Sequence, residues 1–344
     1  VIIGACMIAG GLVLSSLGTI WALYVGYGLM VGLLGNGGVY PPLLVYVTRW
    51  FDKRRGSAVA LISSGQYVAG VMWPWLIERG MSTVGWQYVL LVYGALVVTF
   101  IVPATFLLKP APLAPSVAPL PRGLASGGGR IAGLHPNLVQ ALICAAGFCC
   151  CIPMSIPSAH IVAFCGDVGI ALTHGAAMLS VMLAAAFLAR QLWGMLADRI
   201  GGLRTVMTGS ACQAIAIACF LLTQDEIGLF VVATAFGLGF SGIIPSYSVA
   251  IRELFPSAEA SWRIPLTLFT AMSGMAFGSW FAGALYDHFG YYGPAFGAGV
   301  AFNILNLVIV GFLVERTRRP RIPLPPRPKF EENRGSMTLG RGLA

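Results

Sequence analysis

An arginine stands inside an apolar stretch of the sequence, where water is scarce. Arg190 lies in the run FLARQLWGMLADRIGGLR, which covers 187–204. It precedes Asp198, which we place at a helix end, by roughly 12 Å along a helix. A charge at that depth costs several kcal/mol and normally faces a wet cavity or a partner. Because the guanidinium suits a carboxylate, Arg190 is the first candidate to bind an anionic ligand, with a structural ion pair or a gate as the alternative.

Several other polar residues within apolar runs are candidates to line the same path. Polar side chains in membrane spans usually face the bundle interior, but they also hold helices together by hydrogen bonds. Tyr40 stands beside Pro41 and Pro42, which free backbone carbonyls. His160 could titrate near physiological pH and act in coupling, or it could be a hydrogen-bonded packing residue. The candidates are Asn36, Tyr40, Gln66, Tyr67, His160, Ser246 and Tyr247.

A short motif follows Arg190 and occurs twice in the sequence. Gly194-x-Leu-x-Asp198-x-x-Gly201 has the same spacing as G-x-L-x-D-x-x-G at 283–290. Glycine permits close packing or a tight turn, and the acid sits where a helix meets water. A carboxylate near the positive N-terminus of another helix can stabilise one closed state and be released in the other. We therefore expect Asp198 and Arg199 to act at a gate, with a solvated loop charge as the alternative.

The composition indicates an all-α integral membrane protein. The chain of 344 residues is 57% hydrophobic and only 10% charged, and its apolar residues form runs long enough to cross a bilayer core of about 30 Å. These runs are apolar on all sides, which disfavours a β-barrel. We expect ten spans, at about 1–17, 20–48, 57–78, 86–108, 136–164, 173–196, 203–223, 227–250, 264–286 and 291–314.

The positions of the basic residues predict the orientation. Of the 21 Lys and Arg residues, only Arg79 is expected outside and only Arg190 within a span, because short cytoplasmic loops retain positive charge. Both ends of the chain are then cytoplasmic, in a multi-pass protein of the plasma (inner) membrane. The net charge of +9 reflects these loops and a basic tail near anionic lipids, and indicates no nucleic-acid partner.

The predicted spans fall into two groups. A Pro-, Gly- and Ser-rich stretch predicts a flexible linker at 109–135, between a bundle at 1–108 and a second bundle at 136–315. Residues 316–344 are expected to form a disordered basic tail. RWF at 49–51 parallels RELF at 252–255, and this repeat predicts that two helices and a loop, matching 136–202, precede residue 1. The plan is therefore 4+6 helices with the first two missing.

Nothing in the sequence predicts a cofactor, a metal or catalysis. The eight cysteines lie in or near spans without metal-ligand spacing and are expected to pack as small residues. A nucleotide-hydrolysing loop of the G-x-x-x-x-G-K-[ST] type is absent from the sequence. We expect a monomer that is not an enzyme.

Two segments resemble a known family. GMLADRIGGLR at 194–204 resembles the major facilitator superfamily signature between the second and third helices of a bundle, here in its second copy. RWFDKRRGSAVALISSG at 49–65 resembles a connection in the monocarboxylate transporter and oxalate/formate antiporter branch.

The resemblance implies a secondary transporter whose two bundles rock about a central site. In the branch that it resembles, an arginine four residues before the glycine engages the anionic substrate, and Arg190 matches it. An aspartate one turn earlier is tied to proton coupling in that branch, but Ala186 stands here. The resemblance also implies that Asp198 meets the start of the span after DKRRG, near Arg55 and Gly56.

We therefore expect transport of a small organic anion, such as a monocarboxylate, by proton symport or anion exchange. The predicted substrate-binding residues are Arg190, Tyr40, Gln66, Tyr247 and His160, and the predicted gating residues are Asp198, Arg199, Gly194, Gly201 and Arg55. The alternatives are an exporter of hydrophobic or drug-like compounds and a non-transporting membrane sensor or inactive fragment, because one fold hosts many functions.

Overall fold

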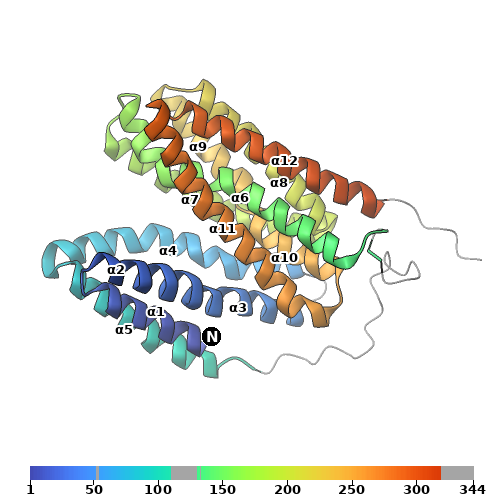
Figure 1. Ribbon diagram of the computed structural model, residues 1–344, viewed down its shortest axis with the longest axis horizontal. Coiled ribbons are helices and arrows are strands. Elements are labelled where there is room, and N and C mark those ends of the chain that lie inside the picture. The colour runs from blue at the N-terminus through green and yellow to red at the C-terminus, as the bar shows by residue number, and fades with distance from the viewer. Residues whose placement is uncertain (52–53, 110–129, 132, 319–344) are drawn as a thin grey trace, which may run out of the picture.

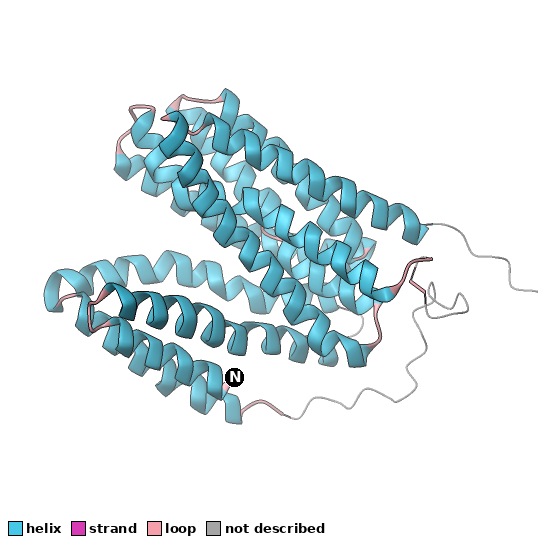
Figure 2. Ribbon diagram, viewed as in Figure 1, coloured by secondary structure: helices cyan, strands magenta, loops and turns pink. Residues whose placement is uncertain are grey.

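The computed structural model describes residues 1–51, 54–109, 130–131 and 133–318, and these residues are almost entirely helical (Figure 2). Residues 319–344 of the expected tail at 316–344 and most of the expected linker at 109–135 lie outside the described residues, whereas 316–318 belong to the last helix. The first group of helices is α1 (Ile2–Ser15), α2 (Ile20–Leu23), the π-helical segment η1 (Tyr24–Gly35), α3 (Asn36–Trp50), α4 (Arg55–Val84) and α5 (Trp86–Phe106). The second is α6 (Pro136–Asp167), α7 (Leu172–Ile200), α8 (Gly202–Leu222), α9 (Glu226–Phe240), α10 (Ile243–Leu254), α11 (Ser257–Phe289) and α12 (Gly293–Arg318).

Within the described residues, eight helical segments are long and apolar enough to cross a membrane. Two of them join several elements: α2, η1 and α3 form Ile20–Trp50, and α9 and α10 form Glu226–Leu254. The first expected span appears as α1, which is shorter at 14 residues, and the third appears as α4, a helix of 30 residues that is not among the eight. The count of ten spans stays a prediction.

Glycines make the sharp turns between neighbouring helices. Gly85 separates α4 from α5, and Gly201 separates α7 from α8, each with a φ of +88°. This left-handed conformation costs glycine little, whereas a Cβ would strain it. Antiparallel neighbours can therefore follow one another almost directly, which places the end of α7 beside the start of α8.

The two groups of helices meet at one end and diverge toward the other (Figure 1). They meet where α3 ends and α11 begins, which is also the end at which α6 starts and α12 finishes. Antiparallel α4 and α7 form the longest contact between the groups. It runs from Gly56 beside Asp198, where the two hydrogen bond, to Gly70, where an added Cβ would lie 3.5 Å from Leu183. Farther along α4, the side chains of Val71 and Met72 are exposed.

Candidate functional site

Arg190 is buried at the contact between the two groups of helices. It lies ten residues before the end of α7, roughly 15 Å from that end, and its side chain is only 1% exposed. Its Nε donates to the Ser241 carbonyl at 2.9 Å, its Nη1 to the Ser63 carbonyl at 2.8 Å and its Nη2 to the Tyr67 hydroxyl at 2.8 Å. The guanidinium carbon also lies 4.4 Å from the centre of the Tyr67 ring. Arg190 thus ties α7 to α4 and to the break between α9 and α10.

The Ser241 carbonyl is available because of a proline. In a regular helix this carbonyl would accept a hydrogen bond from the backbone N–H of residue 245, but Pro245 has none. The chain breaks between α9 and α10 at this point, and an unpaired carbonyl within a membrane needs a donor. The Nε of Arg190 supplies that donor.

Tyr40 of α3 lies within electrostatic reach of the Arg190 guanidinium and beside Ser63. Gln66, in contrast, has an exposed side chain, and its neighbour Tyr67 makes the direct contact with Arg190. Tyr40 and Tyr67 therefore lie beside Arg190, whereas Gln66, with its exposed side chain, lies next to these two tyrosines.

The charge of Arg190 is not neutralised by its hydrogen-bond partners. All three acceptors given above are uncharged, two carbonyls and one phenol. Ala186, one turn earlier on α7, is fully buried and carries no charge. A buried cation with uncharged partners favours an anion that reaches it.

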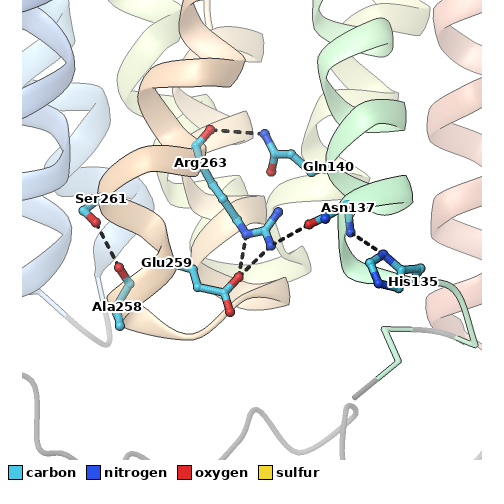
Figure 3. Close-up of polar contacts among 7 residues, drawn as sticks. All are labelled: His135, Asn137, Gln140, Ala258, Glu259, Ser261 and Arg263. Carbon is cyan, nitrogen blue, oxygen red and sulfur yellow. Dashed lines mark hydrogen bonds and ion pairs between the residues drawn. The ribbon is translucent and has the colours of Figure 1, made fainter. Parts of the chain in front are cut away.

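A second buried arginine, Arg263, differs from Arg190 because a carboxylate beside it neutralises its charge (Figure 3). Arg263 is 3% exposed, and its Nη2 lies 2.6 Å from the Glu259 carboxylate one turn earlier. Its guanidinium also lies 4.0 Å from the centre of the Phe255 ring and 4.2 Å from that of Trp262. Arg263 directly precedes the expected span 264–286, and it lies within α11, which begins earlier, at Ser257. Arg263 has its own carboxylate, whereas Arg190 has none among these contacts.

Asp198 caps the start of α4 from the other group of helices. Its Oδ1 accepts from the backbone N–H of Gly56 at 2.6 Å, and its Oδ2 accepts from the N–H and the hydroxyl of Ser57 at 3.0 and 2.6 Å. The first N–H groups of a helix have no partner within it, and the positive helix end attracts a carboxylate. The contact lies where the resemblance placed it. Its role as a gate stays a prediction.

The remaining expected gating residues surround this contact. Gly194 lies against the start of α4, and Arg55 lies in the electrostatic neighbourhood of Glu253. Glu253, at the end of α10, accepts from the N–H of Gly202 at 2.9 Å and so caps α8, directly after Gly201. Arg199 is exposed at the end of α7. Two carboxylates, Asp198 and Glu253, thus cap two neighbouring helices at this end.

Gly194→Val is expected to weaken the closed contact between α4 and α7. A Cβ at this position would lie 2.5 Å from the Cβ of Ala60 and 2.9 Å from the Gly56 carbonyl, so the helices must separate. Such overpacking typically costs about 1–3 kcal/mol, and we expect a lower melting temperature in detergent. Gly65→Ala on α4 is the control, because nothing lies within 4 Å of its added Cβ. Equal effects of both substitutions would contradict the close contact.

Two expected substrate-binding residues make their contacts elsewhere in the second group. The Tyr247 hydroxyl donates to Oδ1 of Asn306 at 3.1 Å, and both residues are buried. His160 uses both ring nitrogens: Nε2 lies 3.0 Å from the Ser279 carbonyl, and Nδ1 lies 3.2 Å from the Tyr292 hydroxyl. A neutral ring satisfies both contacts when Nε2 donates and Nδ1 accepts. The structure does not bring these two side chains to Arg190.

Three groups that contact the expected residues were not predicted from the sequence. The Ser63 and Ser241 backbone carbonyls carry no side-chain signal, although Pro245, four residues after Ser241, could have indicated the second of them. Ser57 could have been predicted from its place at the start of a helix, where a serine hydroxyl commonly takes part in capping.

These features define a class of protein. The chain is a multi-pass, all-helical membrane protein whose two groups of helices meet around a buried cation. It belongs to the major facilitator superfamily, because the family model of that description matches residues 1–154 and 143–341. This match confirms the superfamily and the all-helical fold class that the sequence indicated, while the plan of 4+6 helices with the first two missing stays a prediction.

Curated relatives and a solved structure agree with this assignment. The chain is 24% identical over 282 residues to the MFS-type transporter pynF of Aspergillus niger, a match that covers 79% of this chain and 62% of the relative. It is 26% identical over 313 residues to monocarboxylate transporter 13 of Rattus norvegicus, with 88% and 70% covered. The chain therefore spans less than two thirds of the fungal relative. The fold resembles that of the E. coli fucose:proton symporter FucP in the outward conformation, with a TM-score of 0.64 and 13% identity over 91% of this chain and 82% of that one.

Proposed function

We propose that the protein is a secondary active transporter that moves a small organic anion, such as a monocarboxylate, across the plasma (inner) membrane by alternating access. The observation that carries this proposal is Arg190, a buried cation held by three uncharged oxygens at the contact between the two groups of helices. An anion that reaches it would gain a charge-assisted pair, which is stronger than a neutral hydrogen bond. The similarity to a monocarboxylate transporter supports the class of cargo.

The bundles at 1–108 and 136–315 would be the two rocking bodies, with 109–135 as their linker. The basic residues at the end where the groups meet favour a cytoplasmic position for this end, and the tail at 316–344 would lie on the same side. The hydrogen bonds between α4 and α7 lie in the half of α4 nearest that end. The structure would then be a state closed to the cytoplasm, in line with the outward conformation of the similar symporter.

Cargo and α4 would compete for Arg190. The Ser63 carbonyl and the Tyr67 hydroxyl occupy Nη1 and Nη2, the same two donors that a carboxylate needs for a bidentate pair. A bound carboxylate would therefore replace the contacts that hold α4 against α7 at this level. Release of Asp198 from the start of α4 would complete the opening to the cytoplasm.

Coupling would use protons or a counter-anion. The position of the proton-coupling aspartate of the similar branch is Ala186 here, and the acceptors of Arg190 are uncharged. This arrangement favours exchange of one anion for another, which needs no titrating partner beside the arginine.

The proposal is tested by exchange in proteoliposomes that contain the purified protein. Vesicles preloaded with unlabelled cargo are offered labelled monocarboxylates, a neutral sugar or a lipophilic cation. We expect saturable exchange of at least one monocarboxylate and none of the sugar or cation. Flux of the lipophilic cation alone would show an exporter of drug-like compounds instead, and binding without flux would indicate a sensor.

Tyr67→Phe is expected to lower the KM for the cargo. The substitution removes the hydroxyl that competes for Nη2 and keeps the ring that lies 4.4 Å from the guanidinium carbon. Loss of one competing hydrogen bond should lower KM by about threefold to tenfold. Tyr93→Phe, on α5 beside Trp73, is the matched control. A higher KM in Tyr67→Phe would show instead that this hydroxyl binds the cargo.

A further inference from the structure

A groove opens on the side of the molecule where α3 ends and α4 begins. Its volume is about 440 Å³. Its walls come from α3, from the start of α4 and from α7, so that both groups of helices contribute. The lining residues are Val47, Phe51, Arg54, Ser57, Ala58, Leu61, Ile62 and Gln191.

The groove is apolar along most of its length and basic at one end. Leu61 is 68% exposed and Ile62 is 41% exposed, and both lie within the stretch expected to cross the membrane. Arg54 stands just before α4 and is exposed. It makes no ion pair with any residue in the described part of the chain. From Arg54 to Leu61 the helix rises by roughly 10 Å, so the cation lies near the bilayer surface and the apolar wall extends toward its interior.

We propose that this groove binds an anionic phospholipid from the leaflet at this end of the molecule. The phosphate would pair with Arg54, and an acyl chain would lie along Ala58, Leu61 and Ile62. Basic pockets between transmembrane helices bind anionic headgroups. The apolar wall has no group that would stabilise a free anion from water. The charge at one end and the apolar wall beyond it match the two parts of a phospholipid.

The lipid would favour the state in which the two groups meet at this end. Ser57 lines the groove and also donates to Asp198, while Gln191 of α7 lines it and donates to the Ser64 hydroxyl of α4 at 2.8 Å. If α4 separated from α7, Gln191 would move away from the other residues that line the groove. A ligand that binds one state better than the other shifts the population toward that state. This inference concerns the membrane and does not depend on the cargo at Arg190.

Lipid retention by the purified protein tests the inference. The protein is equilibrated with spin-labelled phosphatidylglycerol or phosphatidylcholine in detergent, and bound lipid is counted. We expect the protein to prefer phosphatidylglycerol, and Arg54→Gln to reduce this preference about fivefold. The matched control is Arg204→Gln, an exposed arginine at the start of α8 that does not line the groove, and it should keep the preference. Leu61→Gln should weaken the binding of both lipids.

A second measurement separates the lipid from other anions. Phosphatidylglycerol should raise the melting temperature of the protein and of Arg204→Gln, but not that of Arg54→Gln, because a ligand stabilises the state that binds it. Inorganic phosphate at millimolar concentration should not displace the labelled lipid. Displacement by phosphate, equal retention of the two lipids, or equal effects of Arg54→Gln and Arg204→Gln would each overturn the inference.

Discussion

Replacing Arg190 with alanine is expected to reduce anion exchange by roughly 100-fold, and replacing it with lysine by roughly 10-fold. Removal of one partner from a buried charge pair typically costs about 2–5 kcal/mol. Lysine keeps the charge, but its single ammonium cannot reproduce the planar fork that now reaches Ser241, Ser63 and Tyr67. The measurement is the initial rate of monocarboxylate exchange in proteoliposomes, normalised to the amount of folded protein.

The control for Arg190 is a substitution of the same type at an exposed site. Arg204→Ala also removes one positive charge, at the start of α8, where the side chain is exposed. This variant should leave anion exchange unchanged. Arg263→Ala should lower stability, because it removes a buried side chain that packs against Phe255 and Trp262 and pairs with Glu259. Full exchange by a folded Arg190→Ala variant would rule out Arg190 as the group that binds the cargo.

Asp198→Asn is expected to shift the protein toward the state that is open at the end where the two groups meet. The amide keeps the shape of the carboxylate but loses its charge, and it has one acceptor oxygen where the carboxylate uses two for Gly56 and Ser57. Loss of charge at a helix N-terminus and of a charge-assisted hydrogen bond costs about 1–3 kcal/mol. We expect the ratio of open to closed molecules to rise by roughly 10-fold.

The shift is measured as a distance between two spin labels. Exposed positions at the end of α3 and the start of α8, Trp50→Cys and Arg204→Cys, carry the labels, and the exposed native cysteines Cys6 and Cys212 are first replaced by serine. The population at the longer distance should grow in Asp198→Asn.

Asp287→Asn is the matched control for Asp198→Asn. Asp287 holds the same place in the second G-x-L-x-D-x-x-G motif, near the opposite end of the molecule, and is exposed. The distance distribution should therefore not change in this variant. Identical distributions in the native protein and in Asp198→Asn would contradict a gating role for Asp198.

The superfamily and the position of Arg190 could be predicted because local signals carry them. Long apolar runs indicate membrane helices, and a lone arginine within such a run indicates a buried charge. The motif around Asp198 indicated its contact with the start of α4 through the resemblance. Each of these features lies within one short segment of the sequence.

The partners of Arg190 could not be predicted, because they depend on how α7 lies against α4. Two of the three acceptors are backbone carbonyls, of Ser63 and Ser241, and carbonyls are present at every residue. Only Pro245 marked one of them in advance. Periodicity within a single helix does not give the register between two helices from different bundles.

The burial of Arg263 could not be predicted for a related reason. Hydropathy locates the apolar part of a helix, whereas α11 begins six residues before Arg263 with polar and charged residues in its first turns. The pairing of Arg263 with Glu259 and the two aromatic rings buries the arginine within this part of the helix. The partners of a buried arginine must therefore be known before it can be assigned a structural or a ligand-binding role.

Equilibrium binding is the most direct test of Arg190 as the site of the anion. The purified protein and Arg190→Gln are titrated with the labelled monocarboxylate that shows the highest exchange flux. Glutamine is uncharged and keeps a polar side chain, so the comparison isolates the charge. The account predicts saturable binding by the native protein and a loss of at least roughly 30-fold in affinity in Arg190→Gln. Equal affinities of the two proteins would contradict it.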